Sequence, residues 1–208
     1  MMKNNSTISK IIFSGGIAGI IGPIIAMIFV FYAISIYPNF SWYSNFLSDL
    51  GVGKTAPYFN YPLIFEGVMS IIFAIGLAVA LPKSAWSKVG VILLIIGSIC
   101  LALAGVFNEN STDHIHEFVA LLYFLLFPLS FIILGLSNFN NFKNYSTLSI
   151  LAGLVALIAI FVHGQHAIPE LTEALILSAW VIANGVLMVS KKGSTFVKRK
   201  IGVEEWKH

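Results

Sequence analysis

Apolar runs of about 20 residues alternate with short polar segments along most of the chain. An α-helix needs roughly 20 residues to cross a hydrocarbon core about 30 Å thick. Prolines mark several of the boundaries, because Pro38 follows the first run, Pro82 ends the second and Pro169 suits the first turn of the last. The pattern predicts six transmembrane helices at about residues 11–36, 62–82, 88–107, 117–137, 146–164 and 170–190.

The amino-acid composition excludes an ordinary soluble protein. Of the 208 residues, 58% are hydrophobic and only 10% are charged, whereas a soluble domain carries roughly 25% charged residues. A single cysteine, Cys100, excludes an intrachain disulfide and a cysteine-rich metal site. We therefore expect an all-α integral membrane bundle, with one six-helix transmembrane domain over residues 1–190 and a basic tail over residues 191–208.

Basic residues gather on every second connection between the predicted helices. If the N-terminus is cytoplasmic, eleven of the twelve lysines and arginines lie on the cytoplasmic side and only Lys54 lies outside, as the positive-inside rule requires. We expect a multi-pass protein of the cell membrane with both termini in the cytoplasm and a tail that contacts anionic lipid headgroups. Because orientation accounts for the positive charge, we expect no nucleic-acid partner.

In this orientation the other ionisable residues collect on the outer face, with seven of nine acids and four of five histidines. Glu66 and Glu173 lie about four residues inside predicted helices, where a charge facing lipid is costly, so both are expected to face the bundle or a water-filled cavity. The alternative is a solvated interfacial face, since carboxylates near helix N-termini are also stabilised by the helix dipole. The predicted outer polar cluster comprises Ser48, Asp49, Asn60, Glu66, His116, Glu170 and Glu173.

The outer histidines suggest metal chemistry. His116, His163 and His166 supply the ligand type of a zinc site with three protein ligands and one open position for water. In such a site Asp49 or Glu66 would act as the general base. The ligand types fit zinc, but the spacing of these histidines is not a diagnostic signature.

Two stretches resemble a known family. They are SWYSNFLSDLGVGKTAPYFNYPLIFEG (41–67) and GVFNENSTDHIHEFVALLYFLLFPLSFIILG (105–135), and both are similar to the prokaryotic membrane proteins catalogued as domain of unknown function 998. The positions that carry the resemblance are Tyr43, Ser44, Ser48, Asp49, Leu50, Gly51, Asn60, Gly105, Phe107, His116 and Ala120. The resemblance implies the fold and a role for the outer face, and it implies no reaction. His163 and His166 lie outside the family's pattern.

A looser comparison concerns membrane hydrolases of the alkaline ceramidase and progestin-receptor-like superfamily, which use Ser, Asp and three His around zinc. Ser48, Asp49 and the outer histidines are similar in kind, but helix count and motif order differ, so the comparison is an analogy.

Three functions are therefore open at this point. The leading hypothesis is a non-catalytic subunit or scaffold that associates with membrane lipids and other membrane-protein subunits. The second is a metal-dependent hydrolase or transferase that acts on lipid headgroups at the outer face. The third is a proton or cation transporter in which Glu66 and Glu173 line the path.

Overall fold

The structure is a computed structural model that describes residues 2–140, 142–162 and 166–190. Within these ranges the chain is helical and contains no strand. Three short 3-10 turns lie in the connections, η1 (Ser48–Gly51), η2 (Gly53–Thr55) and η3 (Thr112–His114). The long helices are α1 (Met2–Ile36), α2 (Ala56–Ala80), α3 (Ala85–Val106), α4 (Ile115–Asn138), α5 (Lys143–Val162) and α6 (Ala167–Val189).

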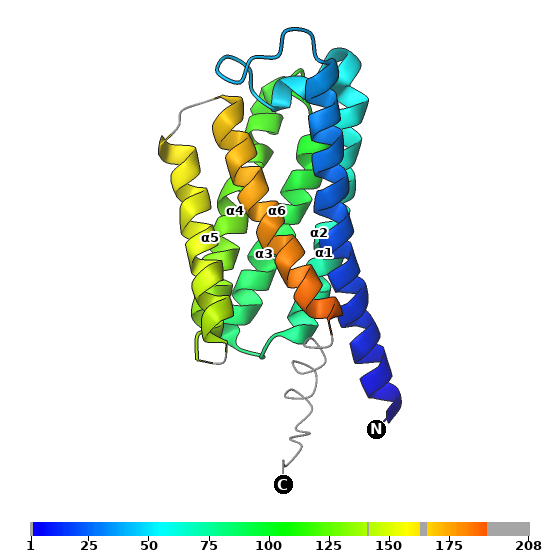
Figure 1. The fold of residues 1–208 in the computed structure, drawn as a ribbon, viewed down its shortest axis with the longest axis vertical. Helices are drawn as coiled ribbons and strands as arrows, with labels where there is room; N and C mark the ends of the chain where they lie inside the picture. Colours follow the sequence, from blue (N-terminus) through cyan, green and yellow to red (C-terminus); the bar gives the residue numbers. More distant parts are fainter. Residues whose placement is uncertain (1, 141, 163–165, 191–208) are drawn as a thin grey trace.

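Consecutive helices run antiparallel and pack side by side as a bundle (Figure 1). One end carries the α1–α2 connection, the α3–α4 connection and the start of α6, and we call it the distal end. The opposite end carries the start of α1, the end of α6 and the α2–α3 and α4–α5 connections, and we call it the terminal end. The connections therefore group as the sequence pattern predicts. The predicted tail, residues 191–208, lies outside the described residues.

The helices have the length and composition of membrane spans, which confirms the predicted all-α membrane bundle. In the part of the chain that the structure describes, five helices qualify: α1, α2, α3, α4 and α6. The fifth predicted span, 146–164, corresponds to α5, whose described apolar stretch Lys143–Ala159 is shorter. Large apolar side chains such as Phe13, Ile28 and Leu148 are more than half exposed, which suits contact with lipid and not with water.

A layer of aromatic side chains fills the middle of the bundle. Phe131 of α4 stacks on Trp180 of α6 with ring centroids 3.8 Å apart, and Phe73 of α2 meets the same indole edge-on at 6.2 Å. The indole Nε1 donates a hydrogen bond to Ser149 Oγ of α5 at 2.9 Å. Phe73, Phe127 and Phe131 are at most 2% exposed. Contacts of this aromatic layer therefore connect α2, α4, α5 and α6 at one level of the bundle.

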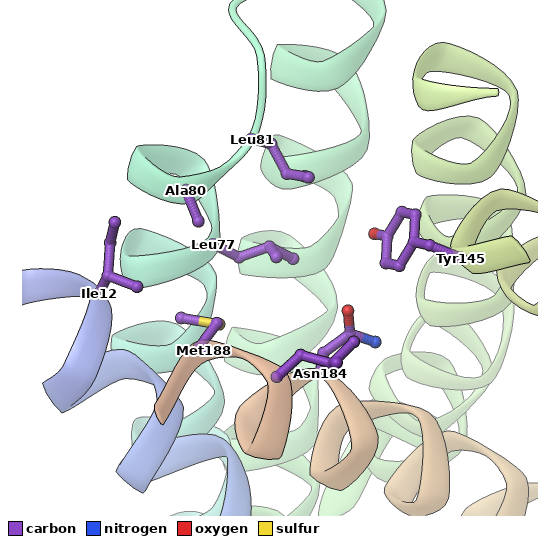
Figure 2. Close-up of a pocket in the computed structure, with 8 residues that line it drawn as sticks. Ile12, Leu77, Ala80, Leu81, Tyr145, Asn184 and Met188 are labelled. Carbon is purple, nitrogen blue, oxygen red and sulfur yellow. The ribbon is translucent and has the colours of Figure 1, made fainter. Parts of the chain in front are cut away.

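A small cavity lies between the aromatic layer and the terminal end (Figure 2). Its volume is about 20 Å³, which is room for about one water molecule. Asn184 and Tyr145 face it from α6 and α5, and Asn184 Nδ2 donates to the Trp180 carbonyl at 2.8 Å. This cavity is therefore too small for an organic ligand.

Glycines allow α1 to lie directly against α2. A Cβ atom on Gly15 would be only 2.7 Å from the Cα atom of Gly76, closer than real Cβ contacts allow. Small residues at such crossings permit the backbone contacts that hold membrane helices together, because lipid supplies no hydrophobic force between them. The position of α1, and with it one wall of the bundle, depends on this contact.

We expect the substitution Gly15→Val to push α1 away from Gly76 and to lower the stability of the folded protein by about 1–3 kcal/mol, the usual cost of overpacking. The measurement is the thermal midpoint of the purified protein in detergent. Ile17→Val, a conservative change at a 36% exposed position on the same helix, is the control and should leave the midpoint unchanged. Equal midpoints for Gly15→Val and the wild type would contradict the close crossing.

Candidate functional site

An acid-lined cavity occupies the distal half of the bundle. Its volume is about 990 Å³, and residues of α1, α2, α3, α4, α6 and the η1 turn line it. Among the described lining residues there is no lysine or arginine. The ionisable lining residues are Asp49, Glu66, Glu109, His116, Glu117, Tyr123, Glu170 and Glu173.

Asp49 shapes the loop that forms part of the cavity wall. One of its carboxylate oxygens, Oδ2, accepts hydrogen bonds from Asn45 Nδ2 at 2.6 Å and from the Phe46 backbone N–H at 3.1 Å. Asn60 supports the same loop from α2, because its Nδ2 donates to the Gly51 carbonyl at 2.9 Å. These hydrogen bonds hold the turn in place. Asp49 lines the cavity, whereas Asn60 supports the turn and does not line the cavity.

Hydrogen bonds tie this loop to the two other distal segments. The Leu47 N–H donates to Glu170 Oε2 at 2.5 Å, and the Ala167 N–H donates to the Asn45 carbonyl at 2.7 Å, so the loop is fastened to the start of α6. The Ser48 hydroxyl donates to Glu109 Oε1 in the α3–α4 connection. The three distal segments thus meet around the cavity mouth.

Glu109 lies at the centre of this mouth, within electrostatic reach of both Asp49 and His116. Burial raises the pKa of the Glu109 carboxyl above its ordinary 4.5, the Ser48 hydrogen bond opposes that increase, and the neighbouring Asp49 carboxylate adds to it. Two carboxyl groups in contact repel each other when both are ionised. The folded protein therefore binds a proton at Glu109 more tightly than a solvent-exposed carboxyl group does.

His116 is oriented by backbone carbonyls. Its Nδ1 lies 2.6 Å from the Phe107 oxygen and 3.2 Å from the Ala104 oxygen. Carbonyl oxygens only accept hydrogen bonds, so Nδ1 carries the hydrogen and Nε2 is left as the acceptor of the neutral ring. The 7% exposed ring is thereby fixed against the end of α3 on the cavity wall.

The deepest part of the cavity contains two buried carboxyl groups. Glu66 of α2 is 7% exposed and Glu173 of α6 is 1% exposed, and both line the cavity. Glu173 Oε1 has no hydrogen-bond partner among the described residues. Tyr123 of α4, also buried, lies within electrostatic reach of both carboxyl groups. The deep site therefore combines groups from three helices.

The structure brings six of the seven residues of the predicted outer polar cluster to one cavity, and the exception is Asn60. The predicted cluster did not include Glu109, Glu117 and Tyr123, which also line the cavity. Tyr123 follows His116 by seven residues, which places both on one face of α4, so helical spacing was a usable signal. Glu109 lies in a connection without such periodicity, and no local signal marked it.

The predicted metal ligands are not assembled in the described part of the chain. No group of three His, Cys, Asp or Glu side chains there is placed to hold a metal ion. His163 lies outside the described residues, and His166 lies beside Tyr43 with ring centroids 6.2 Å apart. The zinc site of His116, His163 and His166, with Asp49 or Glu66 as base, stays a prediction.

Comparison with known proteins gives one match. The profile of a family described as "Protein of unknown function (DUF998)" matches residues 20–187. The chain belongs to the DUF998 family. The match confirms the resemblance seen in the sequence, and the matched range contains every lining residue of the acid-lined cavity. Neither the curated proteins nor the solved structures contain a significant match to this member of DUF998.

We expect Asp49→Ala to loosen the loop, because it removes a charged acceptor from the Phe46 N–H. A hydrogen bond to a charged group contributes about 1.5–3 kcal/mol, so hydrogen exchange at the Phe46 amide should accelerate about tenfold to hundredfold. Tyr43→Phe, at a 79% exposed position in the same loop, is the control. Unchanged exchange at Phe46 in a folded Asp49→Ala protein would refute this role.

Glu109 should make stability depend on pH. A carboxyl whose pKa is higher in the folded than in the unfolded protein binds its proton more tightly when folded, so stability falls as the pH rises above 4.5. Glu109→Gln keeps the shape and cannot ionise. Thermal midpoints measured from pH 4.5 to neutrality should fall less in this variant than in the wild type, and identical slopes would argue against the effect.

Proposed function

We propose that this DUF998 protein binds a positively charged ligand in the acid-lined cavity and carries it without chemical change. The observation that supports the proposal is the pair Glu66 and Glu173, two buried carboxyl groups that face the same cavity. Carboxyl groups at membrane depth are expensive and usually mark ion or substrate paths. Of the sequence-based hypotheses, the geometry favours the transporter.

The counter-charge for these carboxyl groups is not supplied by the described lining residues, because none of them is a lysine or arginine. A buried carboxylate is tolerated when an opposite charge or several hydrogen bonds compensate its loss of hydration. Glu173 Oε1 has no such partner among the described residues. A cation that enters the cavity would compensate both carboxylates. The site would therefore select its ligand mainly by positive charge.

The cavity reaches the surface of the bundle near the distal end. Glu117 lies on its rim, with a side chain 72% exposed and paired with His114 at 3.0 Å. On the opposite side, Phe73 and Trp180 follow Glu66 and Glu173 by seven residues, about 10 Å along a helix. The aromatic layer thus separates the acidic site from the terminal end. A central site open to one membrane face is what a carrier presents in one of its two states.

We further propose the orientation expected from the basic residues, with six spans, both termini in the cytoplasm and the cavity mouth outside. The support is the charge distribution: Lys83, Lys88 and Lys143 lie at the terminal end and Lys54 at the distal end. In this orientation the cell membrane is the site of action. Association with lipids and other membrane-protein subunits, and the metal-dependent hydrolase, stay predictions from the sequence.

The experiment is cation transport by the full chain reconstituted in liposomes. Sodium ions, protons and tetraethylammonium are offered in turn under an inside-negative potential. We expect uptake of at least one of them above empty liposomes, reduced about tenfold or more in Glu66→Gln and Glu173→Gln, since a carboxylate that pairs with a buried cation is removed. Failure of all three cations, in both transport and equilibrium binding, would overturn the proposal.

Matched controls are available on the same helices. Ser70 and Ser178 are buried, lie about one turn beyond Glu66 and Glu173, and are not among the lining residues. Ser70→Ala and Ser178→Ala should therefore transport as the wild type does. Equal losses in the serine and glutamate variants would indicate general damage to the bundle and would also count against the proposal.

A further inference from the structure

The chemical class of the cation can be narrowed, and this step rests on the proposed function. The cavity volume of about 990 Å³ lies at the upper end of the range for pockets that hold drug-sized organic ligands, about 300–1,000 Å³. A metal ion with its protein ligands occupies a small fraction of such a space. The size therefore favours a ligand with a substantial organic body.

The acidic groups form two sets, with Asp49, Glu109 and Glu170 near one another at the mouth and Glu66 and Glu173 near Tyr123. Asp49 lies on η1, Glu66 on α2, Glu109 in the α3–α4 connection and Glu173 on α6. No three such groups in the described ranges are placed to bind a metal, and a compact cation such as Ca²⁺ needs six to eight convergent oxygens. The deep pair Glu66 and Glu173 instead suits a cation whose charge lies on a bulky nitrogen group.

Aromatic and aliphatic side chains make up most of the remaining wall. Phe46, Phe59, Tyr123 and Phe124 line the cavity, and aromatic faces attract organic ammonium groups through cation–π interactions. Tyr123 is the aromatic residue within reach of both deep carboxyl groups. The wall that recognises positive charge is therefore continuous with one that contacts hydrocarbon.

We propose that the ligand is an organic ammonium compound with an apolar body and no anionic group. The ammonium lies at Glu66, Glu173 and Tyr123, where the 1% exposed Glu173 carboxyl has an oxygen without a partner among the described residues. The apolar body lies along the aliphatic wall, which includes Leu63 and Leu101.

Zwitterionic headgroups do not fit this site. A phospholipid amine carries a phosphate beside its nitrogen, and that phosphate would enter a cavity with six acidic lining residues and no lysine or arginine among those described. Like charges at such distances repel strongly where water is scarce. The ligand is therefore a net cation, and the ordinary zwitterionic lipids of the membrane are excluded from the site.

The test is calorimetric titration of the full chain in a non-ionic detergent with benzyltriethylammonium as the probe. We expect saturable binding, at least tenfold weaker binding of tetramethylammonium, and no binding of the zwitterion glycerophosphocholine or of benzyl alcohol, which has the ring without the charge. Glu66→Gln and Glu173→Gln should each weaken binding of the probe about tenfold or more, and Ser178→Ala should leave its affinity unchanged.

Tyr123 gives a readout for the aromatic contact. Tyr123→Phe keeps the ring, so Tyr123→Leu should bind the probe about threefold to tenfold more weakly than Tyr123→Phe does, through the lost cation–π contact. Equal affinity of Tyr123→Leu and Tyr123→Phe for the probe would overturn the proposed position of the ammonium group beside Tyr123. Both variants should elute as the wild type does in gel filtration, which separates a lost contact from a lost fold.

The remaining outcomes separate this inference from the proposed function. If sodium ions or protons bind or cross in a manner that depends on Glu66 and Glu173 while benzyltriethylammonium does not bind, the organic ligand is wrong and the cation carrier stands. If glycerophosphocholine binds as well as the probe, the exclusion of zwitterions is wrong. If no cation of either kind binds, both proposals fail.

Discussion

The cost of placing a carboxyl group in hydrocarbon is the constraint on which the distal half of this protein depends. Glu66 and Glu173 lie within membrane-spanning helices, so they require an interior that is not lipid. The bundle supplies it as the acid-lined cavity, bordered by five helices and closed toward the terminal end by the aromatic layer. The cavity meets this requirement, and the dense aromatic layer forms its floor.

The α1–α2 connection completes the site. Leu47 and Leu50 are buried in an apolar cluster with Val30 and Phe59, while the backbone and hydroxyl groups of the same turn bond to Glu170 and Glu109. Apolar anchoring on one side and polar contacts on the other place Asp49 at the mouth. The α1–α2 connection is therefore held in a defined position although it is not a regular helix.

Much of the fold could be predicted from local sequence. Hydropathy is a sum over neighbouring residues, so the helices and the alternation of their connections could be inferred without knowledge of any contact. Boundaries were less accurate: α2 begins at Ala56 and not at residue 62, because Pro57 fits the first turn and Pro62 removes only one backbone hydrogen bond. The 23-residue α6 begins at Ala167 for the same reason, with Pro169 in its first turn.

The sequence by itself determined the all-α membrane architecture and the collection of acidic residues at one end. Only the tertiary structure decided that Asp49, Glu109, Tyr123 and Glu173 share one cavity and that no three described His, Cys, Asp or Glu side chains converge to hold a metal ion. The physical reason is that convergence depends on how each helix is rotated and how closely it crosses its neighbour. Those angles are set by contacts between distant residues, such as Gly15 with Gly76, which hydropathy and local spacing do not encode.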